Sequence, residues 1–255
     1  MRGSHLRSIL IMEHELWLTA LLNKFLGSVV TSVLVKVGFP PADAAHPIPN
    51  YIAMELVVIV LLLLGALWLR SRLSVENPGT FQQAMEMVLQ FTQSMTDEII
   101  GHGGRRYVTL LGTLGLFVAL CNMLGLIPLF MTPTANIQVT LGLAVVAFLY
   151  YNFQGFREHG LVGYLKHLCG PMAALALIMF PIEIISNVGR MLSLSVRLYA
   201  NMQVGDLLAE VFGSLVPIAV PVIFEALHIF VSALQAYIFM LLPAVYIGMA
   251  VSEEH

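Results

Sequence analysis

The stretch PIEIISNVGRMLSLSVRLYANMQVGD, residues Pro181–Asp206, places charged and amide side chains inside a long apolar run. Ionisable groups at membrane depth are costly, so they are functional candidates by default. At about 100° per residue of an α-helix, one face collects Glu183, Ser186, Arg190, Ser193, Arg197 and Asn201, and Asp206 and Glu210 point nearly the opposite way. The stretch therefore predicts one helix with two polar faces, one cationic and one acidic.

Two long helical patterns contain and follow this stretch. They cover Pro171–Ser214 and Pro217–Val251, which at 1.5 Å per residue makes them roughly 65 and 50 Å long. The hydrocarbon core of a bilayer is only about 30 Å thick, so neither helix can stand upright. We therefore expect a steeply tilted helical hairpin that turns at Gly213–Pro217. The second helix carries a polar stripe of its own, made of Glu225, His228, Ser232 and Gln235.

Composition sets the class of protein. The chain of 255 residues is 58% hydrophobic and only 11% charged, and its mean hydropathy is +0.87. Soluble domains contain about 25% charged residues, so the sequence predicts an all-α polytopic membrane protein. A net charge of −3 offers no basic field for nucleic acid. The two cysteines form no metal-binding spacing, and no cofactor is expected.

The rest of the chain divides into an N-terminal part and a membrane domain. Residues 1–50 are interpreted as an N-terminal extension and exterior segment, in which residues 1–11, with MRGSH, are typical of an expression leader or upstream extension. Residues 51–255 form the predicted membrane domain. Its shorter spans are Tyr51–Leu69, Tyr107–Phe130 and Ile137–Phe153, which with the long helices make about five membrane-embedded helices. Thr80–Ile100 predicts an amphipathic helix on the cytoplasmic surface.

Basic residues predict the orientation of these helices. Arg70 with Arg72, the segment Gly101–Arg106, and Arg157 with Lys166 form three separate basic clusters. Because basic residues are enriched on the cytoplasmic side, all three clusters and the C-terminus Ser252–His255 are predicted to be cytoplasmic. Met131–Ala135 and the hairpin turn would then face the exterior.

Four motifs carry a family resemblance. They are SLSVRLYANMQVGD (Ser193–Asp206), NMLGLIP with PTANIQVTL (Asn122–Pro128 and Pro133–Leu141), ALQAYIFMLLPAVYIGMA (Ala233–Ala250) and the terminal SEEH. The sequence resembles subunit a, the proton-channel stator in the membrane (Fo) sector of bacterial F-type ATP synthases. The resemblance covers most of Tyr51–His255.

This resemblance implies a role for each matching residue. Arg197 matches the essential stator arginine that faces the rotor ring, and Gln235 matches the glutamine beside it. The remaining proton-path positions are Asn201, Asp206 and His228 on the exterior side and Glu183 on the cytoplasmic side. Asp206 stands where relatives often have glutamate, and Arg190 where they carry lysine or another residue. Glu225 and Glu210 are further candidates for the exterior path.

The resemblance also implies partners and location. The chain would be a non-catalytic, ion-translocating subunit in the bacterial cell (inner) membrane. It would contact the ring of subunit c, the peripheral stalk of subunit b, the remaining synthase subunits and the lipid bilayer. A sodium-translocating version of the subunit stays an alternative, because the ion-binding carboxylate belongs to the ring.

Two other classes use intramembrane charges. A secondary transporter or ion channel is one alternative, although the chain has no internal repeat or matched broken helices, which many transporters show. An intramembrane enzyme is the other, although no HExxH or similar constellation is present. Co-isolation with a ring of small carboxylate-bearing hairpins would favour the stator, and substrate uptake by the lone chain would favour a transporter.

Overall fold

The computed structural model describes residues 16–38, 46–101, 103–127, 130–169, 176–215 and 219–251. In these ranges every regular element is a helix, which confirms the predicted fold class. The α-helices are α2 (Trp17–Val37), α3 (Asn50–Ser71), α4 (Thr80–Ile100), α5 (Val108–Leu124), α6 (Ile137–Cys169), α7 (Ala176–Leu215) and α8 (Ala219–Val251). Two short 3-10 helices are η1 (Gly104–Tyr107) and η2 (Pro133–Ala135). The SEEH terminus and residues 1–11 lie outside the described residues.

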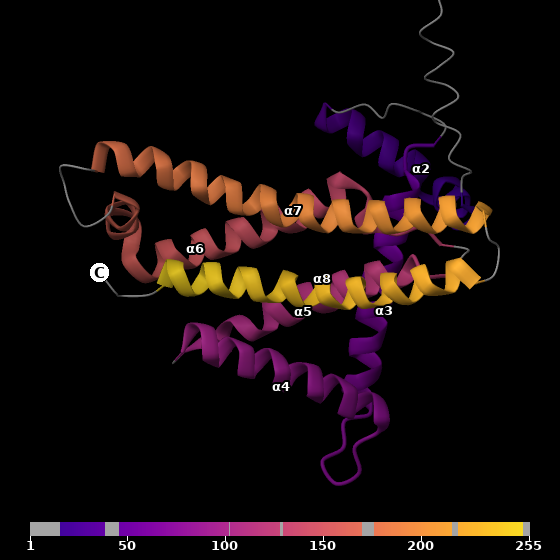
Figure 1. Ribbon diagram of the computed structural model, residues 1–255, viewed down its shortest axis with the longest axis horizontal. Coiled ribbons are helices and arrows are strands. Elements are labelled where there is room, and N and C mark those ends of the chain that lie inside the picture. The colour runs from indigo at the N-terminus through magenta and orange to yellow at the C-terminus, as the bar shows by residue number, and fades with distance from the viewer. Residues whose placement is uncertain are drawn as a thin grey trace, which may run out of the picture.

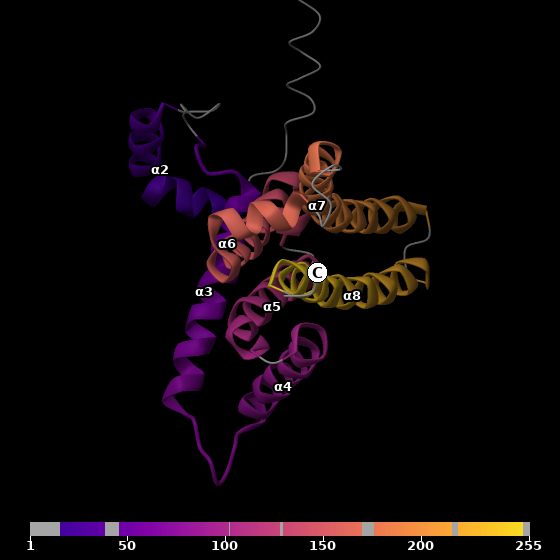
Figure 2. The ribbon, with the colours of Figure 1, turned by 90° about the vertical axis from the view of Figure 1, so that its left-hand side faces the viewer.

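The helices surround a central pair, α5 and α6 (Figures 1 and 2). α7 and α8 lie side by side along one edge of the molecule and run in opposite directions, in contact with α5 and α6. α4 packs along α5 and α8. α3 runs across the direction of α5 to α8, and α2 lies near its N-terminal end (Figure 2). In the described part of the chain, α5 to α8 therefore lie along a common axis, parallel or antiparallel to one another, and α3 crosses that axis.

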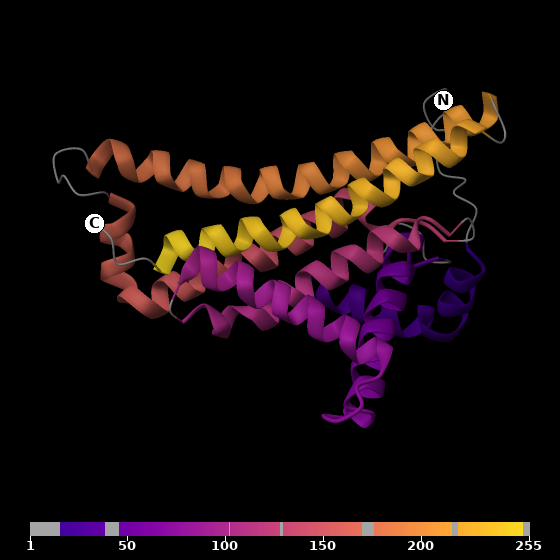
Figure 3. The same cartoon turned by 60° about the horizontal axis from the view of Figure 1, so that its bottom comes forward.

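The predicted long hairpin is present. α7 has 40 residues and α8 has 33, or about 60 and 50 Å at 1.5 Å per residue. α3, with 22 residues, has the length of an upright span of about 30 Å. Because α7 and α8 run across α3 (Figure 3), they are steeply inclined when α3 crosses the membrane. α7 continues to Leu215, inside the predicted turn, and residues 216–218 are not described.

Five segments are long and apolar enough to cross a membrane: Trp17–Lys36, Asn50–Ser71, Gly104–Leu124, Ile137–Gly160 and Val222–Val251. This number agrees with the prediction, but the members differ. The set includes α2, and it does not include α7, which carries several charged side chains. The polar α7 is held instead by packing against α6 and α8.

The predicted bounds of two spans were wrong. The span expected at Tyr107–Phe130 is helical only to Leu124 and continues as turns to Ile127, in a segment that approaches Pro128. The span expected to end at Phe153 continues through residues predicted to be a cytoplasmic loop. α6 changes direction at Gly160, where φ is 69° and ψ is 169°. That conformation is essentially restricted to glycine, so Gly160 permits a second helical segment after the bend.

The predicted amphipathic helix is confirmed as α4 over the expected residues. Its buried side chains include Thr92, Met95 and Thr96, which recur at helical spacing and form the face that packs on α5 and α8. A close approach of α5 to α8 depends on Gly115, because a Cβ there would overlap the side chain of Met240. Core packing therefore holds α4 and α5 against the last helix.

The first prediction tests orientation with single cysteines in a chain whose Cys121 and Cys169 are replaced by serine. Ile127→Cys lies in the α5–α6 connection and Glu76→Cys between α3 and α4, and both native side chains are exposed. An impermeant maleimide added outside intact cells should label residue 127 and not residue 76, because the basic end of α3 is predicted to be cytoplasmic. Permeabilised cells, in which both sites label, are the control. The reverse pattern would invert the topology.

Candidate functional site

Polar side chains occupy three successive levels along α7. Glu183 and Arg190 lie in its first half, Arg197 near its middle, and Asp206 toward its C-terminal end. At 1.5 Å per residue, Arg197 is about 20 Å from Glu183 and about 14 Å from Asp206 along the helix axis. An uninterrupted helix therefore separates two polar clusters, with an arginine between them.

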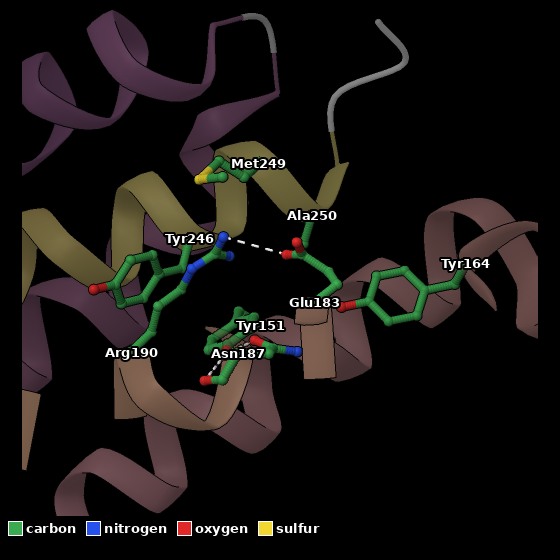
Figure 4. A pocket seen from close by; sticks show the side chains of 8 residues that line it. All are labelled: Tyr151, Tyr164, Glu183, Asn187, Arg190, Tyr246, Met249 and Ala250. Atoms are coloured by element: carbon green, nitrogen blue, oxygen red, sulfur yellow. Dashed lines mark hydrogen bonds and ion pairs between the residues drawn. The ribbon is translucent and has the colours of Figure 1, made fainter. Parts of the chain in front are cut away.

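The first cluster lines a small pocket and is called here the pocket cluster (Figure 4). The pocket has a volume of about 50 Å³ and is lined by Tyr151, Tyr164, Glu183, Asn187, Arg190, Tyr246, Met249 and Ala250. A guanidinium nitrogen of Arg190 lies 3.3 Å from a carboxylate oxygen of Glu183. Its guanidinium carbon also lies 5.7 Å from the ring centre of Tyr246, within cation–π range. Sequence reasoning named Glu183 and Arg190 separately, and the structure joins them as an ion pair.

A hydrogen-bond network forms one wall of this pocket. The Tyr151 hydroxyl donates to the Asn187 side-chain oxygen, and Asn187 Nδ2 donates to Asn152 Oδ1 at 3.1 Å. The Tyr164 hydroxyl donates to the same oxygen at 3.0 Å. A Cβ at Gly155 would overlap the Tyr164 ring. Glycines at 155 and 160 therefore let the end of α6 fold back and place Tyr164 at the pocket.

Arg197 differs from Arg190 in having no partner of its own. Its side chain is exposed, and no hydrogen bond or ion pair joins it to another residue in the described part of the chain. Exposed apolar side chains of both long helices accompany it, among them Leu192, Val196, Val204, Phe230, Leu234 and Tyr237. The arginine thus lies on an apolar surface that α5 and α6 do not cover.

The register of α7 and α8 brings Gln235 to the level of Arg197. His228 faces Asp206 at 3.9 Å, and one turn away the Ser232 hydroxyl contacts the Met202 sulfur at 3.9 Å. Continuing this antiparallel register by another turn places Gln235 within one helical turn of Arg197. The Gln235 side chain is buried, whereas that of Arg197 is exposed.

The second cluster, called here the carboxylate–imidazole cluster, contains Asp206, His228 and Thr132. His228 Nδ1 lies 3.9 Å from Asp206 Oδ1, and Thr132 Oγ1 lies 3.4 Å from the same oxygen. A Cβ at Gly205 would lie 3.2 Å from the imidazole, so glycine leaves the ring room beside α7. His228 Nε2 is buried without a hydrogen-bond partner among the described residues. An imidazole with one nitrogen at a carboxylate and the other unpaired is chemically suited to receive and pass a proton.

Other predicted exterior-path residues lie near this cluster. Asn201 is half-buried on α7, one turn beyond Arg197. Glu225 is half-buried on α8, one turn before His228, and is close enough for its charge to act on Asp206. The side chain of Glu210 lies outside the described residues. The described residues contain no gathering of three or more His, Cys, Asp or Glu side chains that would hold a metal ion.

Sequence reasoning missed the residues that support both clusters. Thr132 was seen only as part of a turn, and Tyr151 and Asn152 as part of an apolar span. The sequence feature that could have pointed to them is a polar side chain next to a proline, as for Thr132, or inside an aromatic run, as for Tyr151 and Asn152 in LYYNF. Such a signal shows that a side chain needs a partner, but not which helix supplies it.

The second prediction concerns the network behind the pocket. Asn187→Ala removes the side-chain acceptor of the Tyr151 hydroxyl and one of the two donors to Asn152 Oδ1, and each lost hydrogen bond costs about 1 kcal/mol. We expect a lower thermal denaturation midpoint for the purified chain in detergent. Val188→Ala, which shortens an exposed side chain on the same helix, is the matched control. Equal midpoints for the two variants would show that the network adds no stability.

Comparison with known proteins agrees with this architecture. The sequence profile of the family described as "ATP synthase A chain" matches residues 52–248. A protein of Koribacter versatilis named ATP synthase subunit a is 43% identical over 244 residues, which cover 96% of this chain and 100% of the relative. A protein of the same name from Solibacter usitatus is 43% identical over 84% of this chain and 92% of its own length. One from Campylobacter jejuni is 40% identical over 83% of this chain and 94% of its own length. This chain belongs to the ATP synthase subunit a family.

Proposed function

We propose that this chain is the proton-conducting stator of its synthase, in which two offset half-channels lead to and from carboxylates on a rotating ring of subunit c. The observation that carries the proposal is the exposed Arg197, which has no ion-pair partner in the described part of the chain and lies on an apolar surface between two polar clusters. An unpaired cation in apolar surroundings is unfavourable unless a partner brings an opposite charge. A ring carboxylate arriving at this surface supplies that charge.

The two clusters are the proposed ends of the half-channels. The carboxylate–imidazole cluster lies beside η2, which packs near the N-terminal end of α3, where the Tyr51 hydroxyl bonds Gln138. The pocket cluster lies toward the other end of α7, where α8 approaches Ile99 of α4. Exposed Arg105, Arg106 and Arg157 support a cytoplasmic location for that end, because basic residues are enriched on the cytoplasmic side. Protons therefore pass Asp206, His228 and Asn201 on the exterior side and Glu183 on the cytoplasmic side.

Arginine suits the position between the half-channels because a guanidinium stays charged even in poor solvent. It attracts a ring carboxylate, favours that group's charged form and promotes loss of its proton to one half-channel. It cannot relay a proton itself, so it blocks direct leakage between the two paths. Gln235, at the same level, provides an uncharged hydrogen-bonding neighbour.

The driving force requires rotation. One elementary charge crossing 100 mV releases about 2.3 kcal/mol, which is too little to form ATP in one step. The free energy of several ring steps must therefore be added by rotation to form one ATP, and the catalytic chemistry lies in other subunits.

The proposed setting is the bacterial inner membrane, with a cytoplasmic C-terminus and the peripheral stalk of subunit b as a further partner. Membership of the family argues against the transporter and intramembrane enzyme alternatives.

The third prediction tests Arg197 in the assembled synthase in membrane vesicles. Arg197→Ala should abolish proton-driven ATP synthesis and coupled pumping while the ring still co-isolates with the chain. Arg197→Lys should also fail or nearly fail, because a lysine beside a carboxylate in low dielectric can give up its proton. Ser193→Ala, one turn earlier and also exposed, is the control and should remain active. Substantial synthesis by either arginine variant would refute the assigned role.

The fourth prediction tests the carboxylate–imidazole cluster. Asp206→Ala and His228→Ala should each slow proton uptake from the exterior and change its pH dependence, because each removes one member of the 3.9 Å pair. Asp206→His combined with His228→Asp should recover part of the flux, since the exchanged pair still joins α7 to α8. Proton flux is followed from pH 6 to 9 with a fluorescent pH indicator in vesicles. Unchanged rates in both single variants would make the pair structural and move the path to Glu225 or Glu210.

A further inference from the structure

The connection between α5 and α6 reaches into the carboxylate–imidazole cluster. Thr132 immediately precedes η2, and its side chain is almost completely buried, at 3% exposure. Its hydroxyl donates to Asp206 Oδ1 at 3.4 Å. Asp206 is more open, with 36% of its side chain exposed. A buried hydroxyl therefore contacts a carboxylate that is partly open to its surroundings.

Other hydrogen bonds hold this connection in place. The Thr134 hydroxyl donates to Asn122 Oδ1 at 2.6 Å, and Asn122 Nδ2 donates to the Ser232 carbonyl at 3.4 Å. The carbonyl of Thr132 accepts the Ala135 amide at 3.1 Å. Thr134 and Asn122 are fully buried. The position of the Thr132 hydroxyl is therefore set by α5 and α8, independently of Asp206.

The space for Thr132 depends on a glycine at the end of α5. A Cβ at Gly125 would overlap Thr132 Oγ1 and lie 2.9 Å from Thr132 Cβ. Gly125 has an ordinary helical conformation, with φ of −65° and ψ of −18°. Glycine is therefore needed at position 125 because of the contact with Thr132, and the backbone conformation there would accept other residues.

We propose that Thr132 is a positioning residue for proton uptake, which holds the Asp206 carboxylate toward His228 in both of its protonation states. A hydroxyl donates to an ionised carboxylate and, after rotation, accepts from a protonated one. Thr132 can therefore keep its contact while Asp206 gains and loses a proton. Among the described residues, the other charged or titratable groups that face Asp206 are His228 and Glu225, both on α8. This inference rests on the proposed function of the Asp206–His228 pair.

The fifth prediction uses variants that separate the hydroxyl from the shape of Thr132. Thr132→Val keeps the shape and removes the hydroxyl, and Thr132→Ser keeps the hydroxyl. In the assembled synthase we expect Thr132→Val to slow exterior-side proton uptake about threefold to tenfold, the range expected from losing one hydrogen bond, and to displace its pH profile. Thr132→Ser should retain both the rate and the profile. Thr113→Val, whose native hydroxyl bonds Thr109 on the exposed side of α5, should behave like the unmodified protein.

A double-mutant cycle tests whether Thr132 acts through Asp206. Asp206→Asn alone should impair uptake strongly, and adding Thr132→Val should cause little further loss, because coupled residues are not additive. If Asp206→Asn has no effect, the proposed exterior path itself is wrong. If Asp206→Asn impairs uptake while Thr132→Val does not, only the positioning role is overturned. An impaired Thr132→Ser variant would also overturn it, because the hydroxyl would then not be the determinant.

Gly125→Ala supplies a second test that leaves Thr132 unchanged. The added methyl crowds the Thr132 side chain and should displace its hydroxyl from Asp206. Co-isolation of the ring confirms assembly of each variant before its flux is measured. Gly125→Ala should reproduce the rate loss and the displaced pH profile of Thr132→Val. An assembled Gly125→Ala synthase with unmodified flux would count against the proposal.

Discussion

An arginine without a counter-ion among the described residues is the constraint on which this molecule depends. The guanidinium of Arg197 keeps its charge and lies among exposed apolar side chains of α7 and α8. Such a charge is tolerated only where the protein controls what comes close to it. The length and tilt of the hairpin serve this requirement, because they present the arginine on an extended surface and keep the polar clusters on either side a few helical turns away.

The remaining helices act as a scaffold for this hairpin. α5 and α6 cover the inner side of α7 and α8, and their buried contacts include Leu198 of α7 and Phe239 of α8. Small residues permit the closest approaches, at Gly115 beneath Met240 and at Gly155 beneath Tyr164. Some polar groups are paired across helices, as in the bonds from Asn187 to α6 and from Asn122 to α8. The charges of the pocket cluster are on α7, and α6 helps to position them. The charges of the carboxylate–imidazole cluster are on α7 and α8, and Asn122 of α5 helps to hold the connection that contacts them.

Sequence reasoning predicted the parts that depend on periodicity and charge. Helical spacing gave α4 its observed bounds, and the excess length of α7 and α8 over a bilayer required a tilted hairpin. The bend at Gly160 and the shortened end of α5 were not predicted, because both depend on local backbone conformation. Thr132 was missed because a hydroxyl in a loop gains meaning only from the carboxylate that tertiary packing brings to it.

The carboxylate–imidazole cluster draws on three parts of the chain that are synthesised at different times. Thr132 precedes Asp206 by 74 positions, and His228 arrives only with the last helix. A nascent chain that has inserted α7 but not α8 therefore carries the acid without its imidazole and the arginine without Gln235. Completion of the last helix brings these partners together, so under the proposed function an unfinished subunit lacks the complete proton path during biogenesis.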